Sequence, residues 1–394
     1  MKKQLPARLP VLLVVVALLL SACGSATDVP YQPTPAGLAN NLPSQITLAA
    51  IQDLSGPNST YGLSIQQGID LAVKQINAQK FMGQGVLLKV AYTDTASSTD
   101  KVMAAFLKAT GDPQLAAIIG PTTSTEAISA DPLAQQAGMP VVASSNTAAG
   151  ITGIGNFIFR TSLPDSAVIP MTAGITTGAL ALKRVAIIYG KDDTTTLETE
   201  ALFKEAFTKD GVQILPEETF VKGQTDFSLQ LDRIDALEPD ALVIAALPEE
   251  AFRIMIQARQ MNIPTSAHYL GGNSLSTPKI AQLAGAVAEG TISSAGWDAG
   301  SNIPASQNFV RAFLAEYGSL PDQFAAQAYT AAWVVALAIQ RGGSTDHASI
   351  RNALVQTRFL GSPLGPFFFD GNRDPVTAPI VMIVKGGRLV PYKP

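Results

Sequence analysis

Cysteine and histidine are almost absent from the chain. Its 394 residues include one cysteine, Cys23, and two histidines, His268 and His347. A single thiol cannot close an internal disulfide. Neither a pair of cysteines nor an HExxH sequence is present. The sequence therefore predicts no metal site and no zinc-dependent catalysis.

An excess of one charge is also lacking, and so are the common nucleotide and nucleophile motifs. The 27 Lys and Arg residues face 31 Asp and Glu residues, so we expect no partnership with nucleic acid. The stretch GPTTSTE (120–126) lacks the second Gly and the Lys of a Walker loop, GITGIG (150–155) misses the GxGxxG spacing, and no GxSxG elbow occurs. We expect no cofactor and no catalytic residue. A hydrolase with an unrecognised triad is the enzymatic alternative.

A long hydrophobic run stands near the N-terminus. The run VLLVVVALLL (11–20) follows positive charge at Met1–Lys3, and it is too short to span a membrane. This pattern is typical of a secretory signal peptide. It continues into LSAC (20–23), which resembles a bacterial lipobox whose cysteine is acylated. We expect residues 1–22 to be a lipoprotein signal peptide and Cys23 to carry the lipid anchor. An ordinary signal peptide that happens to contain a cysteine is the alternative.

The rest of the chain alternates between short apolar runs and helical periods. Residues 23–45, rich in proline and small polar residues, are expected to form a flexible linker. Strands are predicted at 46–51, 87–94, 115–120 and 140–145, and a second series at 184–190, 240–247, 268–272 and 290–297. This rhythm predicts an α/β protein with two Rossmann-like lobes and parallel-rich sheets.

The C-terminal part is expected to return to both lobes. Helical periods begin near residue 307 and again at 321, and PIVMIVKGGRLVPY (379–392) predicts a β-hairpin. We expect lobe 1 to comprise 46–162 and 298–374, and lobe 2 to comprise 163–297 and the hairpin in 375–394. Three segments would then form the hinge.

A row of hydroxyl side chains stands where a strand ends and a helix begins, at residues 122–125. Thr123 and Glu126 fit a capping box, which satisfies the first amides of the helix. The remaining hydroxyls lie beside a helix N-terminus, which favours an anion. We expect Ser124 to donate to a ligand carboxylate, together with the second hydroxyl loop, ASSNTAAG (143–150). Ligands of open α/β sheets bind at such strand ends.

Four stretches together carry a family resemblance. They are DLSGPNSTYG (53–62), GIDLAVKQIN (68–77), IIGPTTSTEA (118–127) and AGMPVVASSNTAAGIT (137–152). In this order and spacing the chain resembles, over residues 46–394, the branched-chain amino-acid-binding (Leu/Ile/Val-binding) proteins of ABC importers. The resemblance implies the type I periplasmic binding protein fold and a ligand in the cleft between the lobes.

The resemblance also implies site residues. On lobe 1 the carboxylate-binding loop falls on Thr122, Thr123 and Ser124, the second clamp on Ser145 and Thr147, and the wall aromatics on Tyr61 and Phe324. On lobe 2 the chain departs from the pattern: Asn273 stands where an acid usually pairs with the ligand ammonium, and Thr194 and Leu247 stand where tyrosines are usual. Asp192, Asp193, Glu249 or Asp298 could supply the charge instead.

The expected function is that of an extracytoplasmic, lipid-anchored solute-binding protein. It would bind an amino acid of the branched-chain or hydrophobic type, or a related small carboxylate, and deliver it to an ABC permease in the membrane. We expect a monomer. A sensor of the same fold that feeds a receptor is one alternative. A binder of aromatic acids or small amides is another, since Asn273 is neutral.

Overall fold

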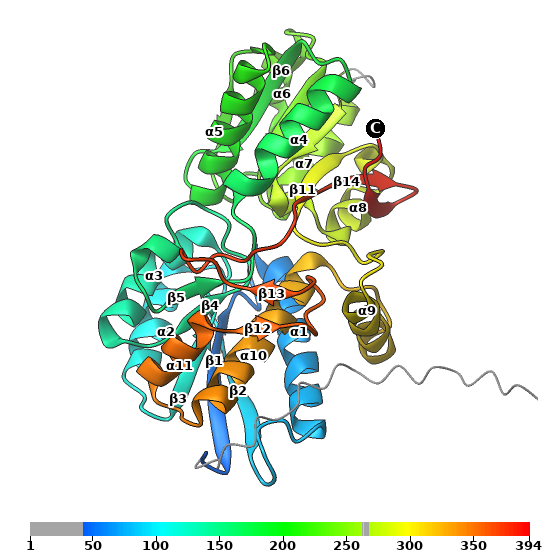
Figure 1. Cartoon of the computed structure of the whole chain (residues 1–394). Helices are drawn as coiled ribbons and strands as arrows, with labels where there is room; N and C mark the ends of the chain where they lie inside the picture. Colours follow the sequence, from blue (N-terminus) through cyan, green and yellow to red (C-terminus); the bar gives the residue numbers. More distant parts are fainter. Residues whose placement is uncertain (1–41, 262, 264–267) are drawn as a thin grey trace, which may run out of the picture.

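A computed structural model describes residues 42–261, 263 and 268–394. Within this part, strands and helices form two lobes that lie one above the other (Figure 1). The predicted signal peptide, Cys23 and most of the predicted linker lie outside the described residues. In the described ranges no helix has the length and apolar character needed to cross a membrane.

The sheet of the first lobe has five parallel strands in the order β2-β1-β3-β4-β5. They are β1 (Gln45–Gln52), β2 (Leu87–Asp94), β3 (Leu115–Ile119), β4 (Val141–Ala143) and β5 (Ile158–Arg160). Successive side chains of β1 enter different cores: Leu48 packs on one face, and Ala49 and Ile51 pack on the other. A parallel strand buried on both faces appears in the sequence as a continuous apolar run, as these strands do.

Helices cover both faces of this sheet. On one face lie α1 (Ser59–Ala78), α9 (Pro304–Tyr317), α10 (Gln323–Gly342), α11 (His347–Val355) and the small antiparallel pair β12 (Arg358–Phe359) and β13 (Phe367–Phe368). On the other face lie α2 (Thr99–Thr110), α3 (Ser124–Ala137) and the 3-10 turn η1 (Thr152–Ile154). Segments far apart in the sequence therefore build one lobe.

The sheet of the second lobe has the order β15-β14-β11-β10-β9-β6-β7, with β8 paired to β6. Its strands are β6 (Arg184–Gly190), β7 (Gln213–Ile214), β8 (Glu218–Phe220), β9 (Ala241–Ala245), β10 (His268–Gly271), β11 (Ile292–Ala295), β14 (Ile380–Lys385) and β15 (Arg388–Pro391). The central strands are parallel, and the C-terminal hairpin adds β14 and β15 in antiparallel orientation.

The helices of the second lobe also divide between two faces. One hydrophobic core lies under α4 (Asp165–Ala179) and α5 (Thr194–Lys209). The core on the opposite face of the sheet lies under α6 (Ser228–Asp235), α7 (Pro248–Gln260), α8 (Pro278–Ala284) and η3 (Gly285–Ala288). The 3-10 turn η2 (Asn273–Leu275) follows β10. Two lobes with parallel-rich sheets confirm the predicted α/β class.

The chain passes between the lobes three times, after β5, after β11 and before β14. Arg160, at the end of β5, connects the first and third crossings. Its Nε donates to Asp374 Oδ1 at 2.6 Å, and its Nη1 donates to the carbonyls of Asn146 and Ala148 at 3.1 and 2.7 Å. Arg160 thereby also holds the second hydroxyl loop. The residue boundaries predicted for the lobes stay a prediction.

Several short elements of the first lobe were not predicted, among them η1, β5, α11 and the pair β12 and β13. Strand β5 has three residues, too few for a period to be recognised, and no helix was predicted over the residues of α11. Because β5 pairs in parallel with β4, the second hydroxyl loop leads into a strand that ends at the first crossing.

Candidate functional site

A cavity lies between the two lobes at the carboxyl ends of their strands. Its volume is about 20 Å³, slightly more than the ~10–15 Å³ that one water needs. The side chains of the two lobes are therefore nearly in contact. Those that line the cavity are Tyr61, Thr122, Thr123, Ser145, Thr147, Thr195, Leu247, Asn273, Ser274 and Phe324. Eight of these were predicted as site residues; Ser124 and Thr194 do not line it.

The first hydroxyl loop ends in the predicted capping box, which is confirmed. Thr123 Oγ1 accepts from the Glu126 N–H at 3.4 Å, and Glu126 Oε2 accepts from the Thr123 N–H at 2.9 Å. Ser124 is buried, and its Oγ accepts from the amides of Thr147 and Ala148 at 3.1 and 3.2 Å. The Ser124 hydroxyl thus joins the two loops, while Thr123 faces the cavity.

Most hydroxyl groups of the cavity have donated their hydrogen to the protein. Ser145 Oγ donates to the carbonyl of Thr122 at 2.6 Å, and Ser274 Oγ donates to the carbonyl of Ala246 at 2.8 Å. Tyr61 Oη donates across the lobes to the carbonyl of Ser274 at 3.1 Å. These oxygens can therefore only accept hydrogen bonds from a ligand.

A buried acid lies directly behind Thr147. Asp165 opens α4, and its Oδ2 accepts from Thr147 Oγ1 at 3.1 Å and from Thr199 Oγ1 at 3.4 Å. Its Oδ1 is buried without a partner. Burial, and then the negative charge of Glu198, raises the pKa of Asp165 to about 7 despite the opposing hydroxyls and Arg160. Sequence reasoning missed Asp165, although an acid directly after a proline at a lobe crossing was a usable signal.

The second lobe contributes an amide without partners. Asn273, at the start of η2, is 2% exposed, and neither its Oδ1 nor its Nδ2 has a hydrogen-bond partner. Its main-chain carbonyl accepts from Gln323 Nε2 of the first lobe at 3.0 Å, which fixes its backbone. An unpaired buried amide is costly, so it marks a place where a ligand can bond.

The predicted site residue Thr194 does not line the cavity, but the next residue does. The Thr194 N–H donates to Thr125 Oγ1 of the first lobe at 3.0 Å, and the next residue, Thr195, lines the cavity. Because Asp193 caps α5 through the Thr196 N–H, the first turn directs Thr195 inward.

None of the four acids proposed from the sequence lines the cavity. Asp192 accepts from the N–H of Lys222, and Asp193 caps α5 and accepts from Thr125 Oγ1 at 2.8 Å. Asp298 lies in a separate groove beside the C-terminal hairpin. The negative charge around the cavity comes instead from acids behind its lining: Asp193, Glu250 and Asp165 all act on Tyr61, and Asp165 also bonds to Thr147.

Two aromatic rings form the apolar wall. Tyr61 and Phe324 meet edge to face with ring centroids 4.6 Å apart, and each is 4% exposed. Leu247 stands on the second lobe. The cavity thus has a hydroxyl-rich polar end and an aromatic and aliphatic wall.

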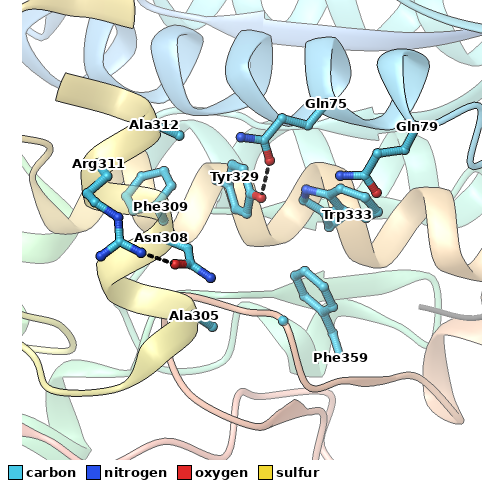
Figure 2. A pocket seen from close by; sticks show the side chains of 11 residues that line it. Gln75, Gln79, Ala305, Asn308, Phe309, Arg311, Ala312, Tyr329, Trp333 and Phe359 are labelled. Atoms are coloured by element: carbon cyan, nitrogen blue, oxygen red, sulfur yellow. Dashed lines mark hydrogen bonds between the residues drawn. The ribbon is translucent and has the colours of Figure 1, made fainter. Parts of the chain in front are cut away.

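A larger cavity, of about 120 Å³, lies within the first lobe between α1, α9 and α10 (Figure 2). Its polar side chains bond to one another: Tyr329 Oη donates to Gln75 Oε1 at 2.6 Å, and Arg311 donates to Asn308. All its lining residues belong to one lobe, so a molecule there would not bridge the two. We therefore take the interlobe cavity as the candidate site. In the described part of the chain, no three His, Cys, Asp or Glu side chains gather in a way that would hold a metal ion.

The two-lobe geometry agrees with a family comparison. Residues 45–388 match the model of the periplasmic binding protein family. The chain belongs to this family. The family predicted from the motifs is thereby confirmed, and so is its general role, the substrate-binding component of the branched-chain amino-acid type of ABC transporter.

Individual relatives are distant but cover most of the chain. A Leu/Ile/Val-binding protein homologue of Brucella melitensis is 26% identical over 86% of this chain and 90% of its own length. The branched-chain amino acid transporter substrate-binding protein LivJ of Streptococcus pneumoniae, solved with isoleucine, is 26% identical; the match covers 89% of this chain and 100% of LivJ with a TM-score of 0.81. A solute-binding protein of R. palustris, solved with benzoate, has a TM-score of 0.79 at 22% identity, covering 88% of this chain and 95% of its own.

Proposed function

We propose that this family member binds a hydrophobic α-amino acid, or a related small carboxylate, between its lobes and delivers it to an ABC permease. One observation carries the proposal: the Asn273 carboxamide is buried and unpartnered in a cavity built by both lobes. Its Nδ2 can donate to a ligand and its Oδ1 can accept, so bonding a ligand there removes the cost of two unpaired groups.

The ligand carboxylate is assigned to Thr123. Its Oγ1 accepts the Glu126 N–H and keeps its own hydrogen for a ligand. It also lies at the N-terminus of α3, whose dipole favours a negative charge. The apolar part of the ligand would lie against Tyr61, Phe324 and Leu247. In this arrangement no basic side chain is needed, and none lines the cavity.

Ligand access requires the lobes to separate. Besides the bond from Tyr61 to Ser274, the Ala149 N–H donates to Glu198 Oε2 at 2.6 Å across the cleft. These bonds break on opening. Because the cavity of about 20 Å³ is smaller than an amino acid, the loaded protein closes less tightly than the arrangement described, and a ligand that contacts both lobes favours that closure. A permease can then distinguish the loaded protein by its shape.

Replacement of Asn273 by leucine tests the proposal. The variant removes an unpaired buried amide, so the free energy of unfolding is expected to rise by about 1–2 kcal/mol. Binding of L-leucine, measured by calorimetry, is expected to fall at least tenfold because the ligand loses its bond to Asn273. Asn352→Leu, an exposed change on α11, is the matched control. Undiminished leucine affinity in Asn273→Leu would contradict the site.

Asn273 also favours a second candidate class of ligand. A neutral amide in place of an acid, beside the Tyr61–Phe324 pair, also suits an aromatic acid such as the benzoate bound by the R. palustris protein. A thermal-shift comparison of L-leucine, L-isoleucine and benzoate distinguishes the two, because a ligand that binds only the folded state raises Tm. Stabilisation by benzoate alone would favour the second class.

The anchoring part of the proposal concerns Cys23. Acylation there would hold the protein on the extracytoplasmic side of a membrane, with the residues between Cys23 and Leu42 as the tether, since Leu42 packs on the first lobe and Gln45 begins β1. Cys23→Ser is expected to move the protein into the soluble fraction, checked by fractionation and immunoblotting. A variant that still sediments with membranes would refute lipid attachment.

A further inference from the structure

We propose that Asp165 is the counter-charge for an ammonium group on the ligand, and that it acts through the hydroxyl of Thr147. The inference rests on the proposed function and specifies the ligand class of the same site: an amine-bearing solute rather than a simple acid. Asp165 does not touch the ligand and is therefore a positioning residue.

The direction of one hydrogen bond carries the inference. Thr147 lines the cavity, and its Oγ1 donates to Asp165 Oδ2 at 3.1 Å. The hydroxyl hydrogen therefore points away from the cavity, and the lone pairs of the Thr147 oxygen can accept a hydrogen bond from a group in the cavity. An ammonium N–H can donate to this oxygen, which the ionised carboxylate behind it polarises.

Asp165 lacks a partner that neutralises its charge. Its Oδ2 accepts from two neutral hydroxyls, and its Oδ1 has no partner. The cation that acts on Asp165, Arg160, bonds to Asp374 and to main-chain carbonyls instead. The other charged or titratable groups that act on Asp165 are Glu198 on α5, which is negative, and Tyr61 on α1. An ammonium group that bonds to the Thr147 hydroxyl would supply the positive charge that Asp165 lacks.

The remaining residues of the site make this assignment specific. Asn273 carries no charge, and no acid lines the cavity. The hydroxyl of Ser145 also faces the cavity as an acceptor, because its hydrogen is given to the carbonyl of Thr122. Thr147 and Ser145 therefore form an acceptor pair for an ammonium group, and Thr123 lies nearby with its hydrogen available for a carboxylate.

The pairing predicts a pH dependence of binding. Burial raises the pKa of Asp165 to about 7, so the carboxyl is mostly neutral at pH 6 and mostly ionised at pH 8. An ammonium ligand binds the ionised form and releases a proton when it binds to the neutral form. The affinity for L-leucine is therefore expected to rise about tenfold from pH 6 to pH 8. Its deaminated analogue, 4-methylpentanoate, is expected to show no such rise.

Calorimetric titration of the full chain with these two probes at pH 6, 7 and 8 tests the inference. In Asp165→Asn, the affinity for L-leucine at pH 8 is expected to fall about ten- to a hundredfold, since the counter-charge behind the Thr147 hydroxyl is lost. The rise with pH is expected to disappear, while binding of 4-methylpentanoate is unchanged. Leucine affinity within twofold of the unmodified protein, or a persisting pH profile, would overturn the assignment.

Two further variants separate the relay from a purely structural effect. Thr147→Val removes the hydroxyl, and the double variant with Asp165→Asn is expected to lose no more leucine affinity than Thr147→Val alone, because Asp165 acts only through that hydroxyl. Additive losses would overturn the path. Asp131→Asn is the matched control: Asp131 is also fully buried with two unpartnered oxygens, but it lies on α3 away from the cavity. It is expected to keep the leucine affinity and its pH profile.

The outcome also distinguishes this inference from the proposed function. If both probes bind equally and Asp165→Asn changes neither, the site stands as a carboxylate site and the ammonium pairing is wrong. If neither probe binds the unmodified protein, the proposed function fails and the inference fails with it.

Discussion

At the scale of single residues, Asp165 makes the stability of the fold depend on pH. Its folded-state pKa of about 7 lies above the ~3.9 of an aspartate in an unfolded chain. The folded protein therefore binds the proton more tightly, and the contribution of Asp165 to the free energy of unfolding falls as pH rises from about 4 to about 7. Above pH 7 the buried charge is a constant cost.

The first prediction concerns this cost. Asp165→Asn keeps an oxygen that accepts from Thr147 and Thr199 but removes the charge. The variant is expected to be more stable than the unmodified protein at pH 8, by on the order of 4 kcal/mol, and equally stable near pH 4. Urea unfolding over this pH range measures the difference. A difference that did not grow with pH would show that Asp165 does not titrate in the folded state.

Residue roles were predicted from the sequence only in part. The capping box at Thr123 and Glu126 follows from spacing alone, and it is present. The direction of the Ser124 hydroxyl does not, because it depends on the amides of Thr147 and Ala148, which lie on another loop. Asp165 was missed for the same reason: its contact with Thr147 exists only once α4 has packed beside the cavity.

At the scale of elements, Arg160 holds the second hydroxyl loop in place. The side chain is 3% exposed and joins β5, the loop at 146–148 and the third crossing near Asp374. Removing one partner of such a buried pair leaves a charge and two carbonyls unsatisfied.

The second prediction is that Arg160→Leu destabilises the protein by about 3 kcal/mol or more and weakens leucine binding, because the loop presents Thr147 and Ser145. Thermal unfolding and calorimetry measure the two effects. Arg233→Leu serves as the control, because Arg233 pairs with Glu218 at the surface and should leave Tm nearly unchanged. Equal effects of the two variants would argue against a special role of Arg160.

Elements with strong periods were predicted well, and short ones were not. Strand β2 covers Leu87–Asp94 and β6 covers Arg184–Gly190, as predicted from their apolar runs. Strands β5, β7 and β8 have two or three residues each, and their pairing with neighbours, not their own sequence, makes them strands. Whether such short segments become strands depends on tertiary contacts, and these contacts cannot be read from a single sequence.

At the scale of the whole molecule, the segments that follow strands β1, β3, β4, β6, β9 and β10, either the loop or the first turn of the next helix, each supply at least one residue of the cavity. This convergence follows from topology, since the carboxyl ends of parallel strands lie at one edge of each sheet. The separation of the lobes does not follow from it. It is set by contacts between the lobes, some at the cavity, such as the bond from Tyr61 to Ser274, and some outside it, such as the bond between α3 and α5.

Thr125 connects α3 to α5. Its Oγ1 donates to Asp193 Oδ2 at 2.8 Å and accepts from the Thr194 N–H at 3.0 Å, yet it does not line the cavity. Thr125→Ala is therefore expected to weaken closure without changing the ligand's own contacts. Because the lost bonds exist only in the closed arrangement, the affinities for L-leucine and 4-methylpentanoate are expected to fall by the same factor, about fivefold. Ser129→Ala, one turn further along α3, removes only a bond within the helix and should leave both affinities unchanged. A loss confined to leucine would mean that Thr125 acts on the ammonium site and not on closure.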